Sequence, residues 1–192
     1  MHPTPREPSL RADAQRNRER LLVAAEELFL EQGATVSFDD VAKRAKVGIG
    51  TLYRRFPTRD ALLAAMCDER LLAIAQASRA REGVCDPVSA LRLFTEELVT
   101  ATNMYRGLAA LLGVVLNHPT RGCAATTEAG RRLLHQAQAA GLVRRDLSMD
   151  DLVCVITAVS LATGETRDAS SRIAHLVGLF LNGVLERADE GH

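Results

Sequence analysis

Apolar residues recur every three or four positions along most of the chain, which is the spacing of an amphipathic helix. In the first such segment they are Leu21, Ala24, Ala25, Leu28 and Phe29. Gly33 follows this segment as a helix stop. The same period continues beyond residue 58, and no segment alternates apolar and polar residues with a period of two. We therefore predict an all-α fold.

Start and stop signals set the expected helix boundaries. We predict helices over 14–32, 58–80, 126–140, 148–164 and 168–188, and two more along the apolar stripes Leu91–Tyr105 and Leu108–Leu116. Ser148 and Asp151 have the spacing of a capping box, and Asp86-Pro87 places an N-cap before a proline at the first helical position. The stretch 1–12 has three prolines and no apolar run, so we expect residues 1–13 to form a disordered arm.

Residues 37–62 have the pattern of two short helices joined by a tight turn. The apolar positions that would pack together are Val41, Ala42 and Ala45 on the first helix and Leu52 and Phe56 on the second. Ser37 with Asp40 three residues later is a capping-box start, and Val47-Gly48 lies where the chain must turn. This pattern predicts a helix-turn-helix.

The same segment is basic although the whole chain is neutral. The chain has 24 Lys and Arg and 24 Asp and Glu. Between residues 41 and 59 there is no acidic residue, and the basic ones are Lys43, Arg44, Lys46, Arg54, Arg55 and Arg59. Such a surface suits nucleic-acid phosphates, and a solvated basic face is the alternative. Arg59 favours phosphate binding, because it follows the helix start at Thr58, where the helix dipole disfavours a cation and attracts an anion.

The run from Arg18 to Leu63 contains AAEELF, then a glycine, then DVAKRA, then VGIGTLYRRF and a Thr-Arg helix start. In these motifs it closely resembles the DNA-binding domain of TetR-family transcriptional regulators, over about a quarter of the chain. Lys46 departs from the family pattern, which has glycine at this turn, and a left-handed lysine costs about 1 kcal/mol. The resemblance implies an N-terminal three-helix helix-turn-helix DNA-binding domain over 14–60 and a C-terminal helical ligand-binding and dimerisation domain over 61–188.

The resemblance and the chemistry of the side chains give a set of expected DNA contacts. These residues are Ser37, Lys43, Arg44, Lys46, Gly48, Gly50, Thr51, Tyr53, Arg54, Arg55 and Arg59. Gly48 lets the backbone approach DNA closely, and Thr51 and Tyr53 offer hydroxyls to phosphates or base edges. Either Arg54 or Arg55 is a candidate for reading guanine.

The last two predicted helices have more apolar surface than one neighbouring helix can cover. A second copy of the chain is the natural cover, and the resemblance implies a symmetric homodimer in which these helices form a four-helix bundle. The expected interface residues are Ile156, Ser160, Leu176, Val177, Phe180, Leu181 and Val184. Burial of the last helix within a monomer is the alternative.

The helices between residues 91 and 140 combine apolar stripes with polar residues that a sealed core would have to satisfy internally. A mostly apolar pocket with a few polar groups suits a small molecule, and the family resemblance supports this interpretation over a plain core. The expected lining residues are Phe94, Leu98, Thr102, Tyr105, Leu112, Val115, His118 and Leu134.

Motifs for other chemistry are sparse. The four cysteines, Cys67, Cys85, Cys123 and Cys154, have no metal-ligand spacing, which favours reduced thiols and a cytoplasmic protein. There is no nucleophile motif and no glycine-rich phosphate loop, and the apolar runs are too short to cross a membrane. We therefore expect no enzymatic activity, no cofactor and no metal.

These observations favour a repressor that is released from a double-stranded DNA operator by a small-molecule effector. The alternative is a helical ligand-binding or protein-interaction module that does not bind an operator. Steep salt dependence of DNA binding would separate the two functions.

Overall fold

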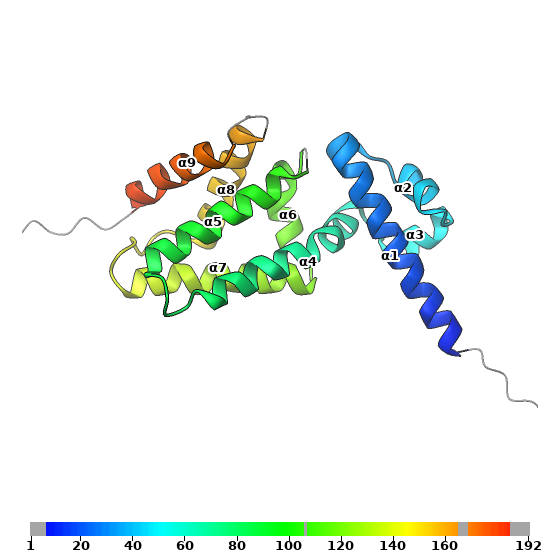
Figure 1. Cartoon of the computed structure of the whole chain (residues 1–192), viewed down its shortest axis with the longest axis horizontal. Coiled ribbons are helices and arrows are strands. Elements are labelled where there is room, and N and C mark those ends of the chain that lie inside the picture. The colour runs from blue at the N-terminus through cyan, green and yellow to red at the C-terminus, as the bar shows by residue number, and fades with distance from the viewer. Residues whose placement is uncertain (1–6, 106, 165–168, 185–192) are drawn as a thin grey trace, which may run out of the picture.

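Helices make up all the regular structure in the part of the chain that its computed structural model describes. The described residues are 7–105, 107–164 and 169–184, without the side chains of 7–11 and 34. No strand occurs among them, which confirms the all-α prediction. Helices α1 (Glu7–Gln32), α2 (Phe38–Ala45) and α3 (Ile49–Arg55) form a small N-terminal domain, and α4 (Arg59–Ala80) leads from it into the larger domain (Figure 1).

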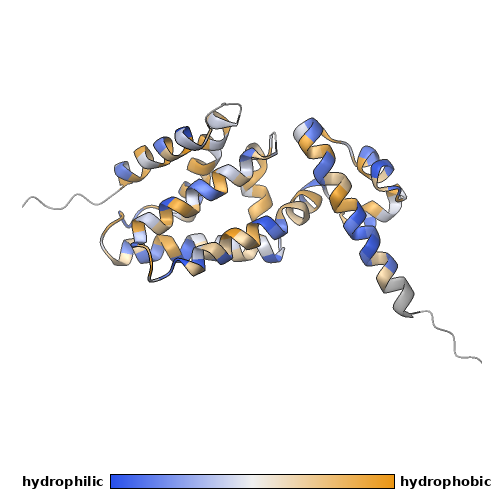
Figure 2. Cartoon of the chain, viewed as in Figure 1, coloured by the Kyte–Doolittle hydropathy of each residue, from blue (hydrophilic) through white to orange (hydrophobic). Residues whose placement is uncertain are grey.

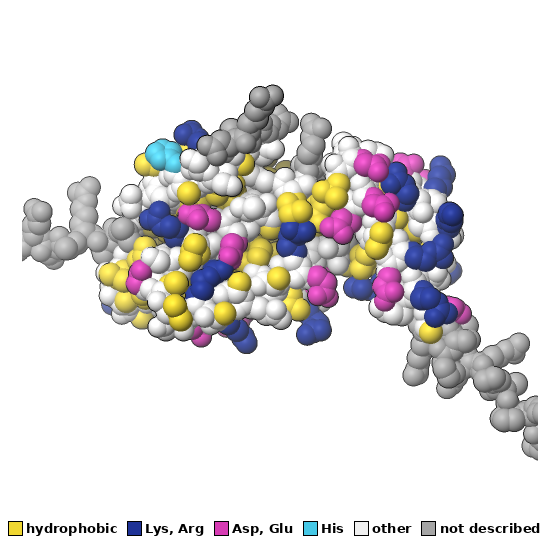
Figure 3. Space-filling model, in the orientation of Figure 1, with side chains coloured by type: hydrophobic (Ala, Val, Ile, Leu, Met, Phe, Trp, Pro, Cys, Tyr) yellow, Lys and Arg dark blue, Asp and Glu magenta, His cyan; other side chains and the backbone are white. Residues whose placement is uncertain are grey.

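The larger domain is built around α5 and α7. Its helices are α5 (Pro87–Asn103), α6 (Leu112–Leu116), α7 (Arg121–Ala139), α8 (Met149–Thr163) and α9 (Ala169–Val184), and the 3-10 helices are η1 (Gly33–Thr35) in the small domain and η2 (Ala109–Leu111) in the large one. Helix α4 packs along α7, while α5 contacts α4, α7, α8 and α9. Apolar faces turn towards neighbouring helices (Figure 2), and charged side chains of both signs lie on the surface (Figure 3). No helix among the described residues is both long and apolar enough to cross a membrane.

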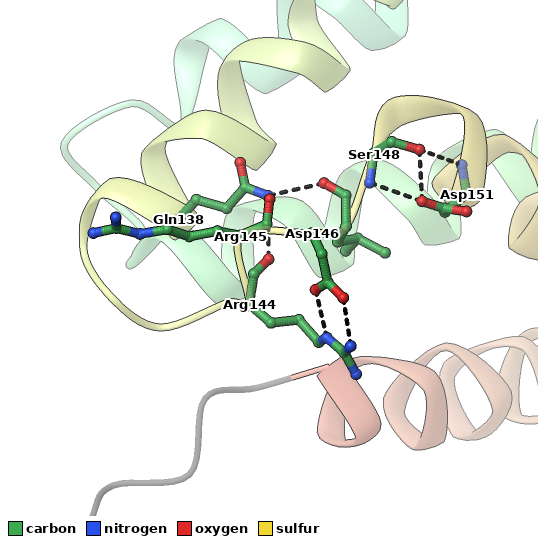
Figure 4. A network of polar contacts seen from close by, with 7 residues as sticks. Gln138, Arg144, Arg145, Asp146, Ser148 and Asp151 are labelled. Carbon is green, nitrogen blue, oxygen red and sulfur yellow. Dashed lines mark hydrogen bonds and ion pairs between the residues drawn. The ribbon is translucent and has the colours of Figure 1, made fainter.

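The predicted helix starts are confirmed at all four capping residues, which are Ser37, Thr58, Asp86 and Ser148. A complete capping box forms at Ser148, whose N–H donates to Asp151 Oδ2 at 2.9 Å while its hydroxyl accepts from the Asp151 N–H. Beside this cap, the Gln138 amide donates to backbone oxygens of the α7–α8 loop, including that of Leu147 at 2.8 Å (Figure 4). These bonds fix the connection between α7 and α8.

The predicted arm over 1–13 is wrong for its second half. Helix α1 begins at Glu7, so residues 7–13 are helical, whereas residues 1–6 lie outside the described part of the chain. Pro8 falls in the first turn, where a helix N–H has no intrahelical partner and proline therefore costs little. Pro8 is therefore compatible with the start of the helix.

Other boundaries also differ from the prediction. Helix α7 starts at Arg121 and not at residue 126, because the Thr120 hydroxyl accepts from the Cys123 N–H at 3.2 Å and caps the helix earlier. Tyr105 lies beyond the end of α5, and the stripe Leu108–Leu116 divides into η2 and α6. The left-handed Gly107, with a φ of 81°, turns the chain between these helices. The predicted last helix is described over 169–184, and its remaining residues lie outside the described part.

Helices α4 and α7 come closest together at Gly122. Its N–H donates to Asp68 Oδ1 at 2.6 Å, and a Cβ at this position would lie 2.1 Å from the backbone oxygen of Asp68. Further along the pair, the Thr126 hydroxyl donates to the Leu71 oxygen at 2.8 Å. A glycine is therefore required where the two backbones meet.

We expect Gly122→Ala to destabilise the protein by about 1–3 kcal/mol, because the added methyl group meets backbone that cannot move aside. Gly113→Ala is the matched control, since the nearest heavy atom to a Cβ there is Val153 Cγ1 at 3.9 Å. The higher helix propensity of alanine should raise the stability of this control by up to about 1 kcal/mol. Urea unfolding of both variants tests the contact, and equal stabilities would contradict it.

Candidate functional site

The turn between α2 and α3 has the predicted geometry. Lys46 caps α2 with φ 54° and ψ 44°, and it is the only non-glycine residue with positive φ in the described part of the chain. The Val47 N–H donates to the Ala42 oxygen at 3.0 Å and the Lys46 N–H to the Lys43 oxygen at 3.1 Å, which is the Schellman pattern. Arg20 of α1 also donates to the Lys46 oxygen at 3.3 Å. Sequence analysis gave no role to Arg20, whose cation offsets the negative end of the α2 dipole.

One face of the α2–α3 unit is buried and the other is exposed. The apolar residues assigned to the buried face, Val41, Ala42, Ala45, Leu52 and Phe56, are all buried. Most of the residues predicted to contact DNA are exposed, namely Ser37, Lys43, Arg44, Lys46, Gly48, Gly50, Tyr53, Arg54 and Arg55, with Thr51 half-exposed. Asp39 and Asp40, in the first turn of α2, are exposed as well. Figure 3 shows Lys and Arg side chains along the outer edge of this domain, away from α5–α9. The unit therefore presents cations, hydroxyls and two glycines to solvent.

Two of these exposed side chains are held by short-range contacts. The Tyr53 ring packs against Phe38 with centroids 5.1 Å apart. The Arg54 guanidinium donates to the Thr51 hydroxyl at 3.0 Å. These contacts orient the polar ends of both side chains on the surface of α3.

Arg44, which was predicted to contact phosphate, forms ion pairs with two glutamates. It donates to Glu31 at 2.9 and 3.0 Å and to Glu27 at 3.2 Å, and both acids belong to α1. The hydrogen bonds to Glu31 and Glu27 raise the pKa of Arg44, and the bond from Arg44 lowers the pKa of Glu31. Arg44 thus ties α2 to α1, and its contact with phosphate stays a prediction. The i, i+4 pair of glutamates was the sequence signal for this bridge.

Arg59 is turned inwards, contrary to the prediction. Its Nη1 donates to the Val36 backbone oxygen at 2.7 Å, and its guanidinium lies 5.6 Å from the centre of the Phe29 ring. Its Nη2 atom is buried and has no hydrogen-bond partner among the described residues. These contacts explain a cation at the start of α4 without any phosphate. Ser37 likewise uses its hydroxyl within the fold, accepting from the Asp40 N–H at 3.1 Å.

A side chain at either glycine of the unit would not clash with the rest of the fold. Gly48 has a φ of −63° and a ψ of 138°, which any residue adopts. A Cβ at Gly48 would meet nothing within 4 Å, and one at Gly50 would meet only the flexible end of Arg54, at 3.9 Å. The space in front of both residues is open to an external molecule.

A small cavity of about 20 Å³ lies between α4, α5 and α6 in the larger domain. Its lining residues are Cys67, Arg70, Leu71, Leu98, Ala101, Thr102, Tyr105, Leu108, Leu112 and Val115. Five of the eight predicted pocket residues are among them. The other three, Phe94, His118 and Leu134, lie outside it: Phe94 and Leu134 are buried in the core and His118 is half-buried elsewhere. A cavity of this volume holds about one water molecule.

Polar groups near the cavity are satisfied within the protein. Thr102 donates to the Leu98 oxygen at 2.7 Å, and Asn103 donates to the Thr163 hydroxyl at 2.8 Å. The Tyr105 hydroxyl donates to Glu26 Oε1 of α1 at 2.7 Å, so this bond joins the two domains. These groups therefore do not by themselves require a ligand, which removes one argument for the predicted pocket.

Five residues of the cavity wall were not predicted, and two of them, Cys67 and Arg70, have titratable side chains. Cys67 is buried, and burial raises the pKa of its thiol to about 12, so it remains neutral. Arg70 received no role, although it occupies the apolar face of α4 between Leu63, Cys67 and Ile74. The sequence signal that could have identified Arg70 is an arginine at a position where the helical repeat predicts an apolar residue.

The predicted dimer residues do not form an exposed surface. Four of them, Ile156, Ser160, Val177 and Leu181, are buried within the chain itself. The other three, Leu176, Phe180 and Val184, are half-buried against the core. Helices α8 and α9 both pack on α5, so their most apolar sides face the monomer core. The opposite side exposes Leu161 at 63% and Leu179 at 57%.

Comparison with known proteins covers both domains. Residues 21–66 match the model for bacterial regulatory proteins of the tetR family, and residues 86–186 match the model for the C-terminal domain of SbtR-like transcriptional regulators. The chain is 41% identical over 64 residues to the HTH-type transcriptional regulator SAR0097 of Staphylococcus aureus, a match that covers 32% of this chain and 33% of that protein. The chain thus matches about a third of that relative's length.

Solved structures resemble the chain over most of its length. The TetR transcriptional regulator SCO0520 from Streptomyces coelicolor is 27% identical, with a TM-score of 0.55, covering 89% of this chain and 99% of that one. Thermus thermophilus FadR, a TetR-family repressor solved in complex with lauroyl-CoA, is 23% identical with a TM-score of 0.63, covering 91% and 98%. The similarity to FadR shows a shared fold.

We expect Arg59→Ala to lower the free energy of unfolding by about 1–3 kcal/mol, because it removes a charged hydrogen bond to a backbone oxygen. Arg55→Ala removes the same charge from an exposed position and should change stability by less than about 0.5 kcal/mol. Urea unfolding of the two variants distinguishes a structural cation from a surface one. An Arg59→Ala protein as stable as Arg55→Ala would restore Arg59 to the phosphate-binding set.

Proposed function

Because the chain belongs to the TetR family of bacterial transcriptional regulators, with its DNA-binding helix-turn-helix over α2 and α3, we propose that it is a homodimeric repressor. In this proposal α3 reads a double-stranded DNA operator, and a small-molecule effector that binds the larger domain releases it.

The observation that carries the proposal is the pair of open glycines at the start of α3. Gly50 lies inside α3, where glycine costs up to about 1 kcal/mol relative to alanine, and none of its neighbours compensates for that cost. Gly48 is the N-cap of the same helix and leaves the space in front of it open. Close approach of a DNA backbone gives both residues a reason to lack a side chain. The exposed cations beside them, Lys43, Lys46 and Arg55, then face phosphates.

In this proposal, the side chains that α3 exposes recognise the base sequence of the operator. Helices of this kind lie in the major groove, where arginine pairs with guanine through two hydrogen bonds. Arg54 and Arg55 are the candidates for this contact, and Thr51 and Tyr53 supply hydroxyls. In a dimer the two reading helices would occupy half-sites about one DNA turn apart, roughly 34 Å.

The effector acts through the cavity between α4, α5 and α6. At about 20 Å³ the cavity is too small for an organic molecule, so the effector must bind a more open form of the domain. If that form holds the two reading helices at the wrong spacing, effector and DNA weaken each other by the same factor. FadR of Thermus thermophilus, which shares the fold and was solved with lauroyl-CoA, supports a ligand-binding role for this domain.

The close approach of DNA to the start of α3 is tested with Gly50→Ala. We expect this variant to be as stable as the wild type or more stable, by up to about 1 kcal/mol, because alanine favours the helix. Its affinity for the operator should fall about tenfold or more, since a clash of about 1.4 kcal/mol at the DNA backbone corresponds to that factor. The operator is first selected from a randomised duplex library with wild-type protein, and gel shifts then compare the two proteins.

The salt dependence of the wild type serves as the control for this experiment. Six or more phosphate contacts per dimer should lower operator affinity by about 10³ between 50 and 200 mM salt. Undiminished operator affinity in Gly50→Ala would refute the close approach. If the library yields no preferred sequence, the chain is a helical module without operator recognition.

The dimer is proposed to form through the exposed sides of α8 and α9. We expect Leu161→Asp and Leu179→Asp to give monomers at micromolar concentration, because each would place an unpaired charge between the two copies. Neither position faces the monomer core, so both variants should keep their helical content. Sedimentation velocity and circular dichroism measure the two properties.

Val84→Asp is the matched control for these variants. Val84 is 81% exposed in the turn between α4 and α5, and we expect the substitution there to leave the dimer intact. Dimeric Leu161→Asp and Leu179→Asp proteins would place the interface elsewhere.

A further inference from the structure

Arg70 brings a positive charge to a cavity whose wall is otherwise mostly apolar. It contacts the Met104 sulfur, and no carboxylate of the described residues forms an ion pair with it. Two other half-buried arginines of the same domain do form ion pairs, Arg81 with Glu97 and Arg132 with Glu82. Arg70 therefore keeps a charge at the cavity wall that an anion could pair with directly.

A second hydrogen-bond donor lines the same cavity. The buried Tyr105 hydroxyl donates to Glu26, and burial, followed by this hydrogen bond, raises the pKa of the tyrosine. The hydroxyl thus remains protonated, and its one hydrogen is held by Glu26 until another acceptor replaces that carboxylate. Figure 1 shows the end of α5, from which Tyr105 follows, turned towards α1. The cavity and the DNA-binding domain meet at this bond.

Resting on the proposed function, we propose that the effector is a small carboxylic acid with an apolar body, bound by Arg70 and Tyr105 in place of Glu26. An arginine fork and a carboxylate form strong, charge-assisted hydrogen bonds. The body of the acid would face the apolar part of the wall, which includes Leu98, Leu112 and Val115. A cationic effector is disfavoured by Arg70, and a neutral one leaves that charge without a partner.

Displacement of Glu26 would connect ligand binding to DNA release. Two carboxylates near one hydroxyl repel each other, so the arriving acid would expel Glu26 from Tyr105. Glu26 belongs to α1, whose residues Leu21, Ala25 and Phe29 form the core of the DNA-binding domain. Losing this bond would therefore free that whole domain from the loop after α5.

Binding is tested by titration calorimetry of the full-length protein with octanoate and 3-phenylpropionate, each compared with its alcohol, octan-1-ol and 3-phenylpropan-1-ol. We expect each acid to bind at least about tenfold more tightly than its alcohol, the factor that corresponds to 1.4 kcal/mol from one charged contact. Arg70→Met should abolish this preference, while Arg79→Met, on an exposed turn of the same helix, should retain it.

Thermal unfolding without ligand checks that the Arg70→Met protein is folded, and Tyr105→Phe provides a second variant that should bind the acids several-fold more weakly. The proposal is overturned if neither acid binds, or if Arg70→Met binds the acids as the wild type does. These results need no DNA, so they decide the ligand class even if the protein recognises no operator.

The coupling between acid binding and DNA release is tested with Glu26→Gln. This substitution keeps a hydrogen-bond acceptor for Tyr105 and removes the charge of the side chain that the ligand must displace. We expect the acids to bind this variant several-fold more tightly than the wild type and to lower its operator affinity by a smaller factor. An equal loss of operator affinity in the two proteins would overturn the role of Glu26.

Discussion

Helix α4 is the element on which the rest of the structure depends, because it belongs to both domains without a break. Its 22 residues span about 33 Å. At its start, Arg59 bonds to Val36 and anchors the helix to the DNA-binding domain. Further along, Asp68 meets Gly122 so closely that only glycine fits, and α7 holds the helix from there on. One continuous helix thus contacts the DNA-binding domain at its start and packs along α7 in the larger domain.

The cations of the small domain divide into two groups with opposite tasks. Arg20, Arg44 and Arg59 point to carbonyl or carboxylate oxygens and hold α1, α2 and the start of α4 together. Lys43, Lys46, Arg54 and Arg55 remain exposed on one side of the α2–α3 unit. The basic character of the segment thus serves both its fold and its proposed contact with DNA. Composition alone does not separate the two groups, because the partners of the first group come from distant parts of the chain.

Hydroxyl and amide groups at the end of α5 are paired within the protein, and one of these pairs, Tyr105 with Glu26, is the one that the proposed ligand would break. Thr102 and Asn103 find their partners within the helices, while Tyr105 finds Glu26 across the domain boundary. A core that is satisfied in this way is stable without a ligand. In the proposal, the carboxylate of the effector would replace that of Glu26 in the hydrogen bond with Tyr105. Stability without a ligand and response to an effector are therefore compatible in one arrangement.

Local sequence determined the helix starts and the buried faces, because capping and helical periodicity involve residues only a few positions apart. Ser37, Thr58, Asp86 and Ser148 cap their helices as predicted, and Leu52 and Phe56 are core. Tertiary structure alone decided what the apolar faces of α8 and α9 pack against. Ile156 and Val177 were expected between two copies, but they pack within one chain, since α8 and α9 both bury their most apolar sides on α5. It also decided the partners of Arg44, Arg59 and Tyr105, because those contacts join residues 13 to 79 positions apart, a separation at which sequence spacing carries no geometric information.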